Sequence, residues 1–267
     1  QNLYRWRGGV VQSVYPMEAE FGKPQWAFGN STYAFERADS IICSYTQNGT
    51  WQLARLNTET ADLMPIDTPY TAISNVQVSN GVASFIGGSA TLPSGVVRLD
   101  LQTNEAPILR QSTDLTVDAA YLSVPEAVEF PTENGLTAHA IYYPPQNRDF
   151  AAPEDEAPPL LVISHGGPTS ASSTTLNLGT QYWTSRGFAV LDVNYGGSTG
   201  YGRSYRQRLN GQWGIVDVQE CVNGAKHLVA PGLVDGERLA IRGGSAGGST
   251  TLCALPFYDT FNAGARC

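Results

Sequence analysis

One serine of this chain is framed by glycines in a way that indicates nucleophilic chemistry. Residues 243–248 read Gly-Gly-Ser-Ala-Gly-Gly, which places Ser245 in a Gly-x-Ser-x-Gly pattern. A strand-like run ends at Arg242, and residues 249–255 can form a helix. A strand, a tight turn and a helix are the context of a nucleophile elbow, which holds its serine in a strained conformation. We therefore expect Ser245 to be a catalytic nucleophile, with the Ala246 amide donating to an oxyanion.

The same glycines have one competing interpretation, a phosphate-binding loop. Gly243 and Gly248 have the spacing of the two glycines in that motif, but Ser249 stands where its lysine is required. The sequence therefore favours the elbow.

A glycine turn upstream could complete an oxyanion hole. The apolar run of residues 160–164 is followed by His165-Gly166-Gly167-Pro168. An α/β hydrolase places its second oxyanion donor after its third strand, and one such donor contributes about 3 kcal/mol to catalysis. Taken alone, these residues would be interpreted as an ordinary turn, but beside the elbow they predict that the Gly167 amide is the second donor.

The elements that must position these groups alternate along the second half of the chain. Strand-like runs at residues 160–164, 188–194 and 238–242 are separated by stretches with helical spacing at 178–187 and 216–229. Continuous apolar strands are typical of a sheet that is buried on both faces. This alternation predicts a doubly wound parallel sheet.

The first half has a different pattern. Short apolar or alternating runs are broken by turn residues such as Gln47-Asn48-Gly49, Ser79-Asn80-Gly81 and Pro93-Ser94-Gly95, as in hairpin-linked antiparallel strands. Leu56-Asn57-Thr58-Glu59 and Leu101-Gln102-Thr103-Asn104 form a weak repeat whose spacing suits β-propeller blades. We favour part of a propeller over a β-sandwich.

The ordered motifs resemble those of the prolyl oligopeptidase family, closest to its acylaminoacyl-peptidase and dipeptidyl-peptidase-like members. The motifs are His165-Gly166-Gly167-Pro168, Asn194-Tyr195-Gly196-Gly197-Ser198-Thr199-Gly200-Tyr201-Gly202, Trp213-Gly214 to Asp217, and residues 243–248. The resemblance implies a serine exopeptidase or oligopeptidase that acts on short peptides, with Ser245 as nucleophile and with Gly167 and Ala246 as the oxyanion-hole amides. Two positions depart from the family: many members have Arg at Gly196 and an aromatic residue at Ser249.

This resemblance implies an α/β fold in two domains. Residues 1–120 are expected to be the last two to three blades of a β-propeller, and residues 121–267 the N-terminal half of an α/β-hydrolase sheet that stops after the nucleophile helix. The start of the chain looks internal to a longer protein.

The remaining triad members are not found in the order that this fold requires, which is Ser, then Asp or Glu, then His. No histidine follows Ser245; His139, His165 and His227 precede it, and Asp259 follows it too closely to be the acid. We therefore expect this chain to be a fragment that is inactive by itself, and a longer parent protein to be active.

Composition and charge argue against several other classes of protein. The net charge of −8 and the absence of a basic cluster argue against a nucleic-acid partner, and no apolar run is long enough to span a membrane. The cysteines, at 43, 221, 253 and 267, show no metal-ligand or disulfide spacing, so we expect free thiols, no metal and no cofactor.

A cytoplasmic location is expected, and a homo-oligomer of the parent protein stays open. A carboxylesterase or lipase on the same fold, and a non-catalytic binding module, remain alternatives.

Overall fold

The computed structural model describes residues 1–266 and contains two compact units; Cys267 lies outside the described residues. The first unit comprises Gln1–Leu115 and two short later segments, Ser173–Leu176 and Thr199–Arg203. The second comprises Thr116–Ser172, Asn177–Ser198 and the residues from Ser204 on. Each unit is built around its own buried apolar side chains.

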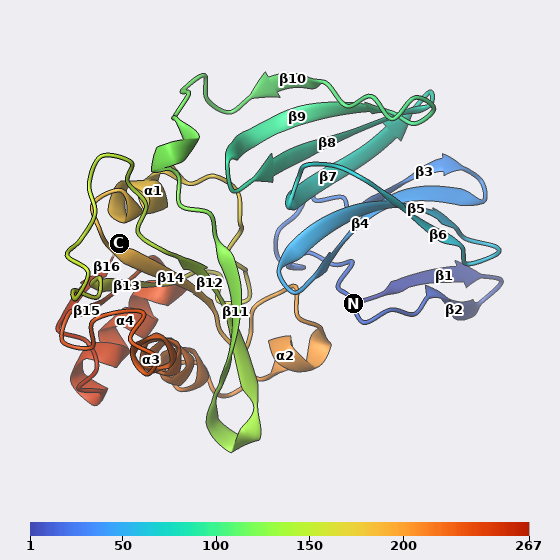
Figure 1. The fold of residues 1–267 in the computed structure, drawn as a ribbon. Helices are drawn as coiled ribbons and strands as arrows, with labels where there is room; N and C mark the ends of the chain where they lie inside the picture. Colours follow the sequence, from blue (N-terminus) through green and yellow to red (C-terminus); the bar gives the residue numbers. More distant parts are fainter. Residues whose placement is uncertain (267) are drawn as a thin grey trace. The chain divides into compact units, whose positions relative to one another are not determined.

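The first unit consists of antiparallel strands (Figure 1). They are β1 (Leu3–Arg7), β2 (Val10–Tyr15), β3 (Tyr33–Arg37), β4 (Ser40–Gln47), β5 (Thr50–Asn57), β6 (Leu63–Ile66), β7 (Ala72–Ser79), β8 (Val82–Ser89), β9 (Leu92–Asp100) and β10 (Ile108–Gln111). Strands β3 to β6 form one four-stranded sheet in chain order, β7 to β10 form a second, and β1 pairs with β2. The first unit thus contains the same up-and-down arrangement of four strands twice.

The sequence repeat falls at equivalent turns of these two sheets. In the first sheet, Asn57 ends β5 and its side-chain oxygen accepts the amides of Glu59 and Thr60. In the second, Asp100 ends β9 and accepts the amides of Gln102 and Thr103. An Asn or Asp side chain that accepts backbone amides in this way initiates a turn. The repeat therefore marks the connection from the third to the fourth strand of each sheet.

One turn was predicted at the wrong place. Pro93-Ser94-Gly95 lies inside β9, and the chain reverses at Ala90 and Thr91 instead, with Ser89 paired to Leu92. Gly95 pairs with strands on both sides, and a Cβ on it would lie 3.0 Å from the Arg110 carbonyl oxygen. The glycine therefore permits a close approach between strands rather than a turn.

The second unit holds a six-stranded mixed sheet. Its elements are η1 (Ala119–Tyr121), β11 (Glu126–Pro131), η2 (Glu133–Gly135), β12 (Thr137–Tyr143), β13 (Leu160–Ser164), α1 (Leu178–Thr184), β14 (Ala189–Asn194), α2 (Arg203–Gln207), α3 (Val216–Val229), β15 (Leu239–Gly243), α4 (Ala246–Phe257) and β16 (Ala263–Arg266). The strand order is β11-β12-β14-β13-β15-β16; β13 to β16 run parallel, and β11 and β12 form an antiparallel edge. The acidic, proline-rich residues 153–159 form a loop before β13.

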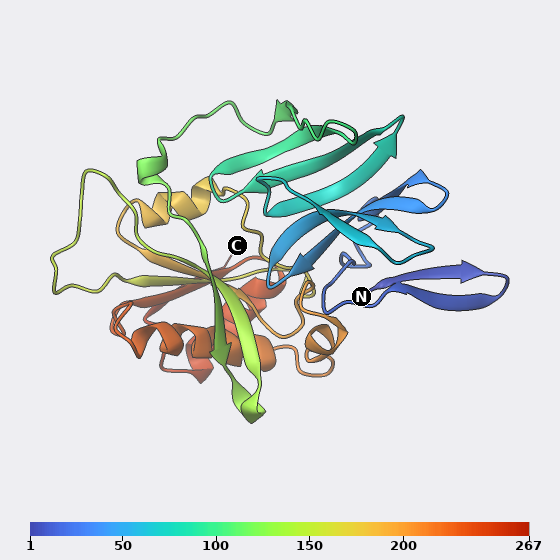
Figure 2. The ribbon, with the colours of Figure 1, turned by 45° about the vertical axis from the view of Figure 1, so that its right-hand side comes forward.

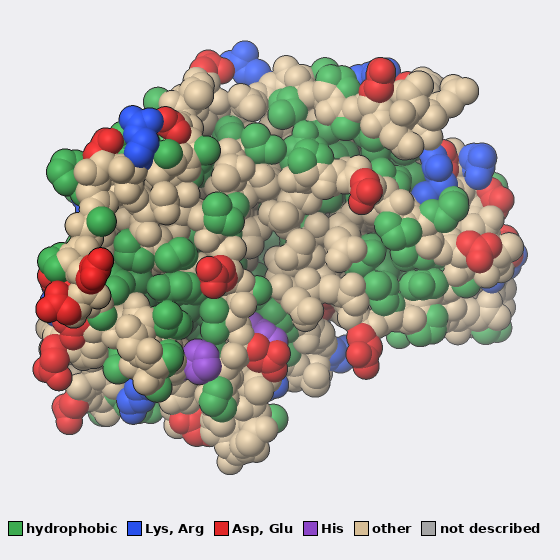
Figure 3. All heavy atoms as spheres, in the orientation of Figure 1, with side chains coloured by type: hydrophobic (Ala, Val, Ile, Leu, Met, Phe, Trp, Pro, Cys, Tyr) green, Lys and Arg blue, Asp and Glu red, His purple; other side chains and the backbone are tan. Residues whose placement is uncertain are grey.

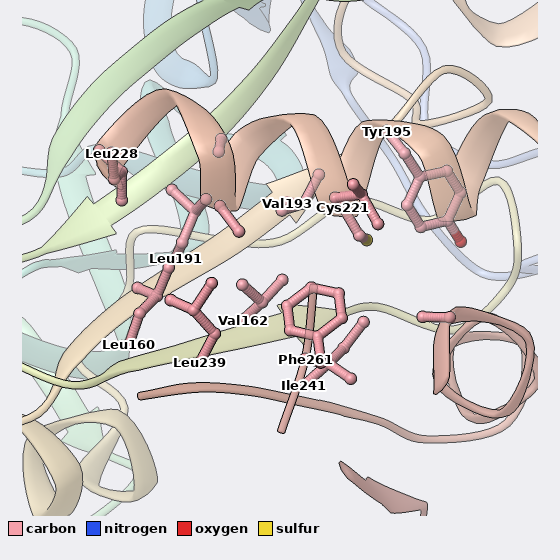
Figure 4. Packing of buried hydrophobic residues seen from close by; sticks show 14 of the residues in the cluster. Leu160, Val162, Leu191, Val193, Tyr195, Cys221, Leu228, Leu239, Ile241 and Phe261 are labelled. Atoms are coloured by element: carbon pink, nitrogen blue, oxygen red, sulfur yellow. The ribbon is translucent and has the colours of Figure 1, made fainter. Parts of the chain in front are cut away.

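Helices cover both faces of this sheet, as Figures 1 and 2 show: α3 and α4 lie on one face and α1 on the other. On the α3 face, Leu160, Val162 and Leu191 pack against Cys221 and Leu228 of α3 (Figure 4). On the α1 face a smaller cluster gathers Ile141, Tyr143, Leu161 and Val190. Burial on both faces explains why β13 and β14 are continuous apolar runs.

Helix α4 begins three residues earlier than predicted, at Ala246 instead of Ser249. The reason is local: Ser245 has a positive φ of 54° and acts as the N-cap, so the chain enters the helix directly after it. The elbow itself is the helix boundary.

None of the helices within residues 1–266 is long and apolar enough to cross a membrane. On the face shown in Figure 3, acidic side chains lie beside most of the basic ones. Arg148 pairs with Asp118, and Arg238 pairs with both Glu156 and Asp235. At these two arginines the positive charge is matched by neighbouring carboxylates.

Candidate active site

Ser245 lies at the carboxyl end of β15, where the chain turns into α4. Its φ of 54° and ψ of −120° are a strained combination for a residue with a side chain, yet the side chain is exposed. The carbonyl of Ser245 accepts the amides of Gly248 and Ser249, which closes the first turn of α4. The structure thus presents the Ser245 hydroxyl on a sharp strand-to-helix turn.

Two glycines around this turn are required by close backbone contacts. A Cβ on Gly247 would lie 2.0 Å from the Ser164 carbonyl oxygen, and a Cβ on Gly243 would lie 2.2 Å from the Gly247 oxygen. A third glycine, Gly166, faces the serine: its Cβ would lie 3.3 Å from the Ser245 Cβ and 3.8 Å from Oγ. Strands β13 and β15 can therefore bring the oxyanion turn and the serine together only because these positions lack side chains.

Both predicted oxyanion donors have free amides. Gly167 has a φ of 118°, and a Cβ on it would lie 2.7 Å from the Ser170 nitrogen. Ala246 is the first residue of α4, where helical amides have no partner within the helix. Neither amide donates a hydrogen bond to another residue within the described part of the chain. Both groups are thus available to an acceptor supplied from outside.

His165 is engaged in the oxyanion turn. Its Nε2 lies 2.7 Å from Ser198 Oγ, its Nδ1 lies 2.8 Å from the Gly166 oxygen, and its ring stacks on Tyr195 at 4.4 Å between centroids. Burial lowers the pKa of His165 to about 4, so the ring is neutral at pH 7. This histidine supports the turn on which Gly167 lies.

The other residues weighed as triad members are placed elsewhere. His139 lies in β12 with its ring against Tyr205, and His227 lies in α3 beside Phe130. Asp259 is exposed beyond the C-terminal end of α4, the end opposite Ser245. Within residues 1–266, no side chain hydrogen-bonds the Ser245 hydroxyl.

A buried carboxylate to which the sequence assigned no role holds α4, the helix that follows Ser245. Asp217 of α3 is fully buried and accepts hydrogen bonds from Thr250 Oγ1, at 2.5 Å, and from the Gly214 amide, at 2.6 Å. Thr250 lies in α4, one turn and a half after Ser245. The Trp213-Gly214 to Asp217 motif was visible in the sequence, but its partner Thr250 was not.

A second buried acid explains one departure from the family pattern. Glu220 of α3 accepts the Gly196 amide and lies 3.8 Å from Arg208 Nη1. A Cβ on Gly196 would lie 3.0 Å from Arg208 Cδ. Arg208 thus fills the space beside position 196, and a larger residue there would require Arg208 to move.

Glu220→Gln should stabilise the protein in a pH-dependent way. Burial raises the pKa of Glu220 to about 7, so the protonated carboxyl is favoured in the fold. The stability that this preference contributes is present below about pH 4.5 and is lost as pH rises through 7. In urea unfolding, the free-energy advantage of the variant should grow by about 2 to 3 kcal/mol between pH 4.5 and pH 8. Glu237→Gln, at an exposed acid, is the control, and a pH-independent difference for Glu220→Gln would contradict the prediction.

A metal site and a ligand cavity apart from Ser245 are the other kinds of site to consider. No group of three or more His, Cys, Asp and Glu side chains converges as a metal site would in the described part of the chain. A cavity of about 1230 Å³ lies beneath the proline-rich loop, at the amino ends of the parallel strands. Its lining includes Tyr142 and Arg186 but none of the residues around Ser245.

The mixed sheet with helices on both faces and a strained serine between strand and helix define a protein of the α/β-hydrolase class. The model of the Prolyl oligopeptidase family matches residues 174–266. Among solved structures, a puromycin-hydrolyzing peptidase of Mycobacterium tuberculosis has a TM-score of 0.95 and 42% identity, covering 99% of this chain and 41% of that one. A puromycin hydrolase has a TM-score of 0.92 and 39% identity, with 98% and 40% covered. These matches confirm the resemblance to the prolyl oligopeptidase family.

The curated relatives match shorter stretches of this chain than the solved structures do. An acylamino-acid-releasing enzyme of Arabidopsis thaliana is 39% identical over 93 residues, or 35% of this chain and 12% of that protein. Dipeptidyl aminopeptidase BIII of Pseudoxanthomonas mexicana is 36% identical over 111 residues, or 41% and 16%. The matched stretches thus cover less than a fifth of the length of these two relatives.

Proposed function

We propose that residues 1–267 supply the nucleophile and the oxyanion hole of a serine peptidase that cleaves short peptides through an acyl-enzyme on Ser245. The observation that carries this proposal is the exposed Ser245 at φ 54°, ψ −120°, on a turn that is closed by glycine contacts. A serine strained in this way persists only where the surrounding structure enforces it. The first unit is proposed to be part of a β-propeller and the second part of a hydrolase domain.

In the proposed reaction, Ser245 Oγ attacks the substrate carbonyl while a histidine takes its proton. The Gly167 and Ala246 amides bind the oxygen that becomes negative. The tetrahedral intermediate then expels the amine, which receives the proton from the histidine, and water hydrolyses the acyl-enzyme by the same steps. Because His165 is bound to Ser198 and the other two histidines lie in β12 and α3, we propose that the base comes from outside residues 1–267.

The names of the relatives narrow the range of proposed substrates. One relative is named for the release of acylated amino acids, one as a dipeptidyl aminopeptidase and one for the hydrolysis of puromycin. We propose an aminoacyl or acylaminoacyl amide as the bond that is cleaved. A carboxylesterase would use the same nucleophile and donors on an ester.

A completed chain would test this assignment. Residues 1–267 are joined to the C-terminal segment of the puromycin-hydrolyzing peptidase that follows the matched region, and this protein is called the completed chain below. It is assayed with puromycin, acylaminoacyl and dipeptidyl arylamides, and p-nitrophenyl esters. We expect amide hydrolysis with kcat/KM on the order of 10⁴ M⁻¹s⁻¹ or more. Turnover of esters alone would favour the esterase, and no turnover with no fluorophosphonate labelling of Ser245 would favour a binding module.

A further inference from the structure

The turn that carries Gly167 is held by residues at the end of the neighbouring strand β14. Tyr195, which directly follows β14, donates its hydroxyl to the carbonyls of His165, at 3.0 Å, and Pro168, at 2.9 Å. These two carbonyls flank the Gly166-Gly167 pair. The single hydroxyl proton is therefore shared between acceptors on either side of the predicted donor.

The position of Tyr195 makes this contact rigid. The side chain is fully buried, and Figure 4 shows it at one end of the apolar core, with its hydroxyl directed away from the neighbouring hydrophobic side chains. Its ring stacks on the His165 ring at an interplanar angle of 16°. Because the ring is fixed by packing, its hydroxyl defines where the two carbonyls can lie.

The far end of the same turn has a second support on β14. Ser172 donates its amide to Asn194 Oδ1, at 2.8 Å, and its hydroxyl to Asp192 Oδ1, at 2.5 Å. Asp192 pairs in register with Ile141 and Ile163, and no cation pairs with it in the described part of the chain. A charged acceptor forms a stronger hydrogen bond than a neutral one, which offsets part of the cost of an unpaired acid among apolar residues.

We propose that Tyr195 is a positioning residue of the oxyanion hole: its hydroxyl holds the carbonyls of His165 and Pro168 and thereby fixes the direction of the Gly167 amide. Ser172 is the second anchor, and it is the last residue of the turn before the chain enters the first unit at Ser173. This inference rests on the proposed function, because it assigns Tyr195 to the donor of that reaction. Tyr195 itself touches no reacting atom.

The loss of the Tyr195 hydroxyl should affect the rate because it would change the direction of the Gly167 amide. An oxyanion donor stabilises the charge that develops in the transition state and contributes little to substrate binding. A displacement of about 1 Å in a catalytic group can lower the rate by about 10²-fold. Removing the Tyr195 hydroxyl should therefore lower kcat and leave KM nearly unchanged.

The first arm of the test uses the 267-residue chain itself and needs no activity. Backbone ¹⁵N relaxation is measured for Gly166 and Gly167 in the wild type, Tyr195→Phe and Ser172→Ala. We expect order parameters near about 0.85 in the wild type and below about 0.6 in Tyr195→Phe, with a smaller fall in Ser172→Ala. Tyr45→Phe removes another buried hydroxyl, which donates to Gln52, and is the control for general loosening.

The second arm measures kinetics in the completed chain. Tyr195→Phe should lower kcat by about 10- to 100-fold with KM changed by less than about threefold, whereas Ser173→Ala, at the exposed neighbour of Ser172, should leave both unchanged. Unchanged order parameters in Tyr195→Phe would overturn the inference, whatever the activity. If the order parameters fall and kcat does not, Tyr195 still anchors the turn, but Gly167 is not an oxyanion donor and that part of the proposed function is wrong.

Discussion

Replacing Ser245 with alanine should lower kcat of the completed chain by about 10⁶-fold, to the level that binding and the oxyanion hole alone provide. Loss of the nucleophile or of the histidine base costs about the same, because the two groups act as one unit. The 267-residue chain should therefore hydrolyse the same amide near that floor, and Ser245→Ala should change its rate little. Initial rates and fluorophosphonate labelling of both proteins check the prediction.

Ser249→Ala is the control for Ser245→Ala. Ser249→Ala removes an exposed hydroxyl from the same helix, four residues further on, and should leave kcat within about twofold of the parent value. A Ser245-dependent rate in the 267-residue chain would show that a base lies within it, and His165 would then be the residue to replace next. Full activity of Ser245→Ala in the completed chain would place the nucleophile elsewhere.

Gly247→Ala should unfold or strongly destabilise the second unit, by about 3 kcal/mol or more. The added Cβ would lie 2.0 Å from the Ser164 oxygen and 2.8 Å from the His165 oxygen, both of them backbone atoms of the β13 end. No side-chain rotation relieves such a contact, so α4 must move away from the strand. Thermal and urea unfolding of the 267-residue chain measure the effect, and no catalysis is needed.

Ser249→Ala again serves as the matched change, since it also introduces alanine into the first turns of α4 but at an exposed position. We expect it to alter stability by less than about 0.5 kcal/mol. A Gly247→Ala variant as stable as Ser249→Ala would mean that the elbow can relax, and that the glycine is not required for the packing of α4 on β13.

The parts of the site that sequence could predict are local. The pattern around Ser245 and the His165-Gly166-Gly167-Pro168 turn each depend on a few consecutive residues, because backbone strain and close approach need glycine at fixed positions. Strands β13, β14 and β15 were predicted within a residue or two, since their apolar runs are continuous. The turn predicted at residues 93–95 was wrong because Gly95 serves strand packing instead.

The supporting residues were not predictable, because each acts through a partner far along the chain. Asp217 holds Thr250, and Tyr195 holds His165 and Pro168. Asp192 and Ser172 are also separated by a helix. Tyr195 and Asp217 stand in motifs that the sequence analysis noted, but no spacing rule links either of them to its partner.

The sequence by itself predicted which serine is the nucleophile and which amides are the donors, since these predictions follow from glycine positions, chain direction and local turns. Only the tertiary structure decided how the candidate site is held: Tyr195, at the end of β14, contacts the turn that carries Gly167, and Asp217 of α3 contacts Thr250 of α4. Such contacts depend on strand order and register, which bring distant residues together in a way that local patterns do not encode.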